Sequence, residues 1–99
     1  MLTGKQRRHL RALAHAIRPL VQVGKDGIDD GLITAVDEAL TTHELIKVKI
    51  YEAANVDRHF AAEEISKRAK AEVAQVLGHT VVLYRANKDD PKIVLPAGK

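Results

Sequence analysis

The 99-residue sequence has no cysteine and only one serine. The absence of cysteine excludes disulfides, zinc ribbons and thiol chemistry. The lone serine, Ser66, lies outside any Gly-x-Ser-x-Gly motif and in the middle of a predicted helix, which argues against a serine nucleophile. No stretch approaches the roughly 20 apolar residues of a membrane-spanning helix, and no signal-peptide pattern follows the basic start. We therefore expect one globular domain, residues 1–99, in the cytoplasm.

Aromatic residues are scarce as well. Tyr51, Phe60 and Tyr84 are the only three in the sequence. Proteins that read single-stranded bases stack them on exposed aromatic rings, so this scarcity argues against such a platform. We expect both tyrosines to be packing residues of a sheet.

Charge is plentiful but segregated along the chain. The net charge is only +3, yet residues 1–25 hold six basic side chains and no acidic one, whereas residues 26–46 hold six acidic side chains and no lysine or arginine. Such asymmetry points to an anionic partner on one side of the fold, although a solvated helix face would produce the same pattern.

The first 18 residues predict an amphipathic helix over roughly 3–17. Thr3 and Gln6 have the spacing of a capping box, and Arg18-Pro19 ends the helix because a residue before proline leaves the α region. An apolar stripe follows helical spacing at Leu10, Leu13, Ala14 and Ile17. A separate basic stripe, flanked by Arg8, consists of Arg7, Arg11, His15 and Arg18.

Strand and helix patterns then alternate. Apolar runs predict strands at 19–23, 45–51, 71–77 and 80–85, with helices at about 29–43 and 57–70 between the first three. The fold class is therefore α/β: an N-terminal helix followed by β-α-β-α-β-β, with three helices on a mixed four-stranded sheet. We expect an ordered core over about 3–86 and an extended tail over 87–99, with Ile93 to Leu95 as a last extended segment.

The helix over 57–70 has a predicted inner face and a predicted solvated face. Phe60, Ala61, Ile65 and Ala69 are expected to point inward. Glu63 with Lys67, and Glu64 with Arg68, have the i,i+4 spacing of helical ion pairs.

No pattern in the sequence supports catalysis. The five histidines are His9, His15, His43, His59 and His79, and none lies four residues from another as in a helical metal site. The adjacent acids Asp29-Asp30 and Glu63-Glu64 suit helix capping and solvation. We expect no enzyme activity, no metal, no cofactor and no small-molecule substrate.

Gly24-Lys25-Asp26-Gly27 joins the first strand to the second helix. A Gly-x-x-Gly loop clamps the nucleic-acid backbone in KH modules, and the amides and helix dipole here have the position to face an anion. Asp26, Asp29 and Asp30 oppose that interpretation, and an ordinary β-α turn remains the alternative. Lys47 and Lys49 share one face of the strand over 45–51. They either contact an anion or are solvent-facing or edge-protecting lysines.

Several motifs, in order, resemble one family of small bacterial RNA-binding proteins. They are Lys5-Gln6 with Leu10 and Leu13-Ala14-His15, Pro19…Val23-Gly24-Lys25-x-Gly27, His43-Glu44-Leu45-Ile46-Lys47-Val48-Lys49, and Gly78…Leu83-Tyr84-Arg85. This pattern, over about residues 3–95, resembles the YhbY family, the stand-alone form of the CRM domain (chloroplast RNA splicing and ribosome maturation). His79 departs from it, since relatives often have lysine there.

The resemblance implies a fold similar to the C-terminal domain of translation initiation factor three, and RNA contact at the Gly-x-x-Gly loop with nearby basic residues. It also implies binding to precursors of the large ribosomal subunit. We thus predict a non-catalytic, monomeric RNA-binding protein that assists ribosome assembly. An Alba-like DNA- and RNA-coating protein and a small histidine-dependent nuclease are the alternatives. The candidate RNA-binding residues are Lys5, Arg7, Arg8, Arg11, Arg18, Gly24, Lys25, Asp26, Gly27, Lys47 and Lys49.

Overall fold

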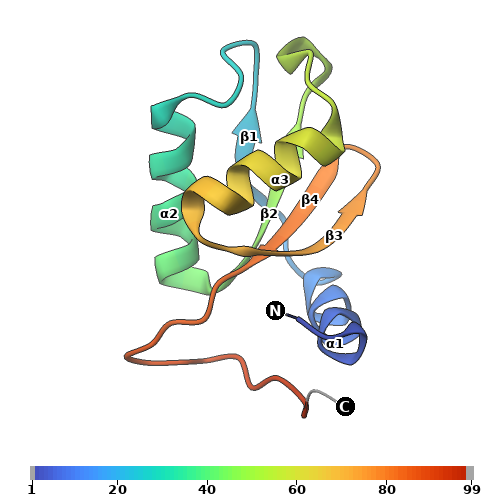
Figure 1. Ribbon diagram of the computed structural model, residues 1–99, viewed down its shortest axis with the longest axis vertical. Helices are drawn as coiled ribbons and strands as arrows, with labels where there is room; N and C mark the ends of the chain where they lie inside the picture. Colours follow the sequence, from blue (N-terminus) through green and yellow to red (C-terminus); the bar gives the residue numbers. More distant parts are fainter. Residues whose placement is uncertain (1, 98–99) are drawn as a thin grey trace.

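The computed structural model describes residues 2–97 (Figure 1). In this range an N-terminal helix is followed by the order β-α-β-α-β-β, as the sequence predicts. The elements are α1 (Gly4–Ala14), β1 (Pro19–Val23), α2 (Asp30–His43), β2 (Leu45–Ile50), the short 3-10 helix η1 (Glu52–Ala54), α3 (Arg58–Ala69), β3 (Glu72–Leu77) and β4 (Thr80–Tyr84).

The four strands form one mixed sheet in the order β1-β2-β4-β3. β1 pairs with β2 in parallel, whereas β2 with β4 and β3 with β4 are antiparallel. The fold class predicted from the sequence is thus confirmed. The loop after β1, the connection after β2 and the β3–β4 turn all lie at one end of this sheet (Figure 1).

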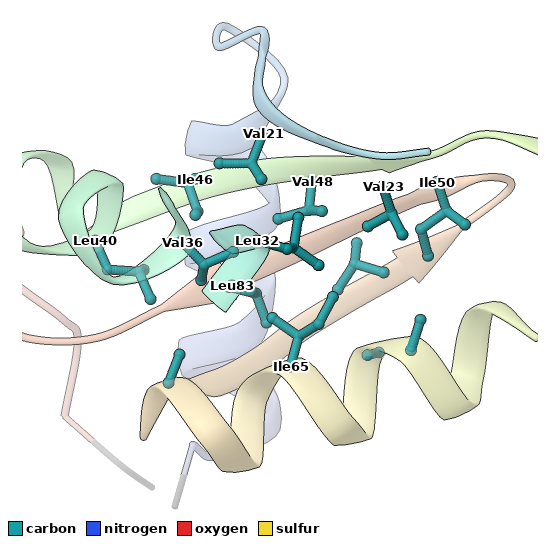
Figure 2. Packing of buried hydrophobic residues seen from close by; sticks show 14 of the residues in the cluster. Val21, Val23, Leu32, Val36, Leu40, Ile46, Val48, Ile50, Ile65 and Leu83 are labelled. Carbon is teal, nitrogen blue, oxygen red and sulfur yellow. The ribbon is translucent and has the colours of Figure 1, made fainter. Parts of the chain in front are cut away.

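The larger core lies between the sheet and helices α2 and α3 (Figure 2). Alternate residues of the strands point into it, as period-two alternation requires. β2 contributes Ile46, Val48 and Ile50, and the two helices contribute buried side chains at helical spacing. The largest of these helix residues are Leu32, Val36, Leu40 and Ile65.

The opposite face of the sheet is only partly covered. Helix α1 packs there through Leu10 and Ala14, against Leu45, Val82 and Tyr84. Farther along β2 on the same face, Lys47 is half-buried and Lys49 is exposed. Because α1 is short, the end of this face nearest the Gly24–Gly27 loop stays open to solvent. We call this region the open sheet face; it comprises Gln22, Lys47, Lys49, Gln75, Leu77 and Thr80.

Helix α1 is shorter than predicted. Its capping box forms as expected, with the Gln6 N–H donating to Thr3 Oγ1 and the Thr3 N–H donating to Gln6 Oε1. The helix ends at Ala14 rather than near residue 17, however, and a tight turn follows. The chain must become extended before Pro19 and also redirect itself into β1, so the reversal begins several residues before the proline. Arg18 therefore lies outside the helix.

Two predictions for α3 were wrong. Phe60 is 56% exposed, and Ala62 takes its place on the buried side next to Ala61. In the described structure neither Lys67 with Glu63 nor Arg68 with Glu64 forms the expected ion pair. The Arg68 guanidinium instead contacts the Asp30 carboxylate at 2.7 Å and the Ile28 carbonyl at 3.4 Å. Tertiary contact with α2 replaces the local helical pair, so Arg68 ties two helices together.

The segment after β4 has no helix or strand in residues 85–97, yet it is held against the body. Ile93 and Leu95 pack on the cluster under α1, and the Gln6 side-chain amide donates to the Pro96 carbonyl. The predicted last extended segment, 93–95, thus contributes apolar side chains rather than a strand. The tail runs along the end of the molecule that holds α1 (Figure 1).

Candidate nucleic-acid interface

The arginines fall into two groups according to what their guanidinium groups contact. Arg68 pairs with Asp30, Arg85 with Asp37 at 2.7 Å, and Arg58 donates to the Gly78 carbonyl. These three hold elements of the fold together. Among the described residues, the other four side chains make no hydrogen bond or ion pair, so their charges are available to a ligand. They are Arg7, Arg8, Arg11 and Arg18.

The basic stripe predicted on α1 is partly present. Arg7 and Arg11 lie one helical turn apart on a half-buried flank of α1, and Arg8 and Lys5 are exposed beside them. His15 is the C-cap residue of α1 and is exposed. Arg18, beyond the turn, is exposed at the start of β1 and not on the stripe. The free cations therefore follow α1 and continue onto the beginning of β1.

The Gly24–Gly27 loop forms a tight turn at the end of β1. The Gly27 N–H donates to the Gly24 carbonyl at 2.9 Å, and Gly27 has a φ of 69°, in the left-handed region that favours glycine. A side-chain carbon added at either glycine would meet no atom within 4 Å. The loop therefore presents bare backbone to the solvent, as close approach by a ligand backbone requires.

A depression of about 400 Å³ runs beside this loop. Its rim combines the loop with the outer edge of β1 and the start of α2, and Lys25 and Asp26 line it together with both glycines. Leu20 and Gln22 also line it from β1, and Leu20 is 55% exposed. The structure thus brings Gly24, Lys25, Asp26 and Gly27 to one groove.

The electrostatics of this groove differ from the expectation that the α2 N-terminus faces an anion. Asp29 is the N-cap, and its carboxylate accepts from the Leu32 N–H at 2.8 Å. One of the free amides of the helix terminus is therefore already occupied by a negative group. Asp26 and Asp29 both line the groove, so it holds two negative side chains against the one positive side chain of Lys25. A phosphate there depends on bare backbone and Lys25 rather than on the helix terminus.

The two strand lysines lie on the open sheet face, on the same side as α1. Lys49 places its ammonium 5.1 Å from the centre of the Tyr51 ring, a cation–π contact. Tyr51 follows β2 and is 40% exposed, so it is not the packing residue that was expected, whereas Tyr84 is buried as expected. Burial raises the pKa of Tyr84, and the nearby Glu44 carboxylate adds to that effect.

Lys47 approaches the C-terminal end of α1. It lines a second, smaller depression together with Arg11 and His15, and with Gln75 and Thr80 from the neighbouring strands. The structure thus joins two predicted sets that the sequence leaves separate, the helix cations and the strand lysines. Gln75 and Thr80 were not predicted as site residues. Strand alternation alone places Gln75 on the opposite face, so it offers no sequence signal.

The predicted residues do not form a single site. β1 separates Arg18 from Lys25, and with about 3.3 Å per strand residue their backbones lie roughly 20 Å apart. Lys5, Arg7 and Arg8 line neither depression. The geometry gives a basic surface on α1 and the open sheet face, and a separate glycine groove at the edge of β1.

Within residues 2–97, no three histidine or acidic side chains gather as metal ligands would. None of the described helices is long and apolar enough to span a bilayer.

Comparison with known proteins identifies the family. The CRS1 / YhbY (CRM) domain model matches residues 2–85, most of the chain. The chain belongs to this family. Over 96 residues it is 43% identical to the probable RNA-binding protein YqeI of Bacillus subtilis, covering 97% of this chain and 100% of that one. An RNA-binding protein of Haemophilus influenzae is 38% identical over 95 residues, 96% of this chain and 95% of its own.

A solved structure of a similar protein agrees with the fold described above. The solution structure of SAV1595 from Staphylococcus aureus, for which RNA binding is proposed, has a TM-score of 0.78 to this chain at 41% identity. The match covers 97% of this chain and all of that one. The mixed sheet with three helices is thus the architecture of a related protein as well.

Proposed function

We propose that this CRM-family protein is a non-catalytic RNA-binding protein that associates with precursors of the large ribosomal subunit and assists their assembly in the cytoplasm. The observation that carries the RNA-binding part is the set of unpaired cations on α1 and the open sheet face. Its family members are RNA-binding proteins by name, which supports the same ligand. The link to the large subunit rests on the family resemblance.

The surface favours recognition of RNA shape and backbone over base sequence. The groups that this surface offers to a ligand are arginines, lysines and bare backbone. Of the exposed aromatic residues in the described part of the chain, Tyr51 lies beside them. Phosphate contacts of this kind position a protein on a folded RNA without reading its sequence. Structured regions of ribosomal RNA are therefore the substrate class that this surface fits.

The experiment is co-sedimentation of the tagged protein with ribosomal particles from cells, comparing the wild type with Arg7→Gln/Arg11→Gln. We expect the wild type in fractions holding large-subunit precursors and the double variant mostly at the top of the gradient. The matched control is Lys67→Gln/Lys88→Gln, which removes the same charge from α3 and the tail. Wild type absent from precursor fractions would contradict the assembly role, and equal behaviour of both double variants would contradict the assigned surface.

A further inference from the structure

The depression between α1 and the open sheet face is built unlike the glycine groove. Arg11 and His15 approach it from the last turn and cap of α1, and Lys47 from the centre of β2. Lys47, Gln75 and Thr80 are all half-buried, so their side chains lie in the wall of the depression rather than free in solvent. Four elements, α1, β2, β3 and β4, thus converge on one small volume.

A β-bulge directs Gln75 into this depression. In the pairing of β3 with β4, Val73 lies opposite Leu83 and Gln75 lies opposite the next residue of β4, Val82. Ala74 is therefore an extra residue on β3 with no partner of its own on β4. Ala74 is buried on the α1 side of the sheet, and Gln75 lies on that side too. Regular alternation would send Gln75 into the larger core. Bulges recur where a side chain must be re-aimed toward a functional site.

The charge of this depression is entirely positive. Among the described residues that line it, the charged ones are Arg11 and Lys47; His15 lies beside them, and none is acidic. The glycine groove, in contrast, sets Lys25 against Asp26 and Asp29. None of the three basic side chains is engaged by another described residue. A phosphate therefore meets a stronger local field beside α1 than at the loop.

The size of the depression limits its ligand. Its volume is about 120 Å³, well below the ~300–1,000 Å³ of sites for cofactors or drug-sized molecules. One phosphoryl group fits, with arginine and lysine as cations and the Gln75 amide and Thr80 hydroxyl as hydrogen-bond donors. Leu77 and Val82 supply an apolar side that suits the carbon atoms of an attached ribose.

We propose that Arg11, His15 and Lys47 form a phosphate pocket that holds one backbone phosphate of the bound RNA, separate from the contact at the Gly24–Gly27 loop. This proposal rests on the RNA-binding function proposed above and assigns the principal anion site of that function. β1 lies between the two contacts, so the RNA backbone crosses the edge of the sheet.

The first test is RNA titration of the wild type, Arg11→Gln/Lys47→Gln, and the control Lys67→Gln/Lys88→Gln. Both double variants lower the net charge equally, so only the position of the lost charge differs. We expect the pocket variant to bind structured ribosomal RNA about tenfold more weakly, with a slope of log affinity against log salt that is smaller by about 1. The control should stay within twofold of the wild type. Equal losses in the two variants would overturn the pocket while leaving RNA binding intact.

The second test needs no RNA, so it separates failure of the pocket from failure of the proposed function. Inorganic phosphate is titrated into the ¹⁵N-labelled protein. We expect the backbone amide signals of Lys47, Gln75 and Thr80 to shift in the wild type and not in Arg11→Gln/Lys47→Gln. If these signals shift although the wild type does not bind RNA, the phosphate pocket is supported and the proposed function is contradicted. If phosphate moves only the Gly24–Gly27 signals, the pocket is overturned.

Discussion

Glu44 is the residue whose environment departs most from that of an ordinary surface acid. It is 1% exposed and caps the end of α2 with a φ of 62°. Its Oε2 accepts from the Asn87 N–H at 2.7 Å, and its Oε1 accepts from the N–H groups of Lys92 and Ile93 at 2.7 and 2.8 Å. A single buried carboxylate thus satisfies three backbone donors and holds the tail on the domain.

Replacing Glu44 with glutamine tests this attachment. The amide has one oxygen instead of two, so in either orientation its NH₂ faces a backbone N–H, and at least one buried donor loses its partner. We expect the free energy of unfolding to fall by about 2–3 kcal/mol, with faster hydrogen exchange at Asn87, Lys92 and Ile93. Glu38→Gln, an exposed change on α2, serves as the control. Equal stability of the two variants would show that the tail is not anchored by Glu44.

The same carboxylate predicts a pH dependence of stability. Burial alone raises the pKa of Glu44, but the hydrogen bonds from Asn87, Ile93 and Lys92 and the charge of Lys92 outweigh it and hold the pKa below the usual 4.5. A carboxyl whose folded-state pKa is depressed stabilises the fold fully above its unfolded-state pKa. That contribution is lost as the pH falls below 4.5 and through the folded value.

Thermal unfolding between pH 7 and pH 3 measures the effect. The wild type should lose stability relative to Glu44→Gln as the pH falls through this window, so that the two melting curves converge at the acid end. A constant difference between them across the range would contradict the depressed pKa.

At the scale of elements, the two glycines of the β1–α2 loop are not equivalent. Gly27 has the left-handed φ of 69°, so any side chain there strains the backbone by about 1–2 kcal/mol. Gly24 has no such φ, and an added carbon meets no atom within 4 Å. Gly24 is therefore the position at which ligand approach can be blocked without disturbing the fold.

Gly24→Asp should weaken RNA binding by about tenfold, because it places a carboxylate where the phosphate approaches. The free energy of unfolding should change by less than about 0.5 kcal/mol. Gly24→Asn has the same size without the charge, and we expect a smaller loss. RNA titration and chemical denaturation measure the two quantities. Wild-type affinity in both variants would remove the loop from the interface.

The elements themselves were largely predictable from the sequence, because their signals are local. An apolar run located β1, apolar alternation located β2, and the capping-box spacing of Thr3 and Gln6 located the start of α1. The errors arose where contacts between distant parts of the chain determine the position of a side chain. Arg68 turns to Asp30 across the fold, and the exposure of Phe60 depends on which side of α3 meets the sheet.

The candidate site was predictable as a list of residues but not as a surface. Composition and spacing identified the α1 cations, the glycine loop and the strand lysines one by one. That Arg11 and Lys47 line one depression follows from the packing of α1 on the sheet. Gln75 joins them because of a β-bulge, and no pattern in the sequence predicts that bulge. Asp29 and Asp30 both suited the cap of α2 in the sequence, and the structure selects Asp29.

At the scale of the whole molecule, α1 and α2 lie on opposite sides of the sheet and carry opposite charge. The free cations of α1, the start of β1 and the open sheet face lie on one side. On the other side, α2 carries Asp30, Asp37 and Glu38 and no lysine or arginine. An RNA that approaches the protein is therefore attracted to one face and repelled from α2, so the charge distribution orients binding before any contact forms.

The most direct measurement is a binding titration of the protein against structured ribosomal RNA fragments and matched duplex DNA at 50 and 200 mM salt. About five phosphate contacts predict a slope of −4 to −5 in log affinity against log salt, and thus a loss of roughly 10²–10³ in affinity between the two salt concentrations. We predict this slope together with a clear preference for RNA. Equal binding to DNA would instead indicate a general nucleic-acid coat, and binding to neither would contradict the assignment of this surface to RNA.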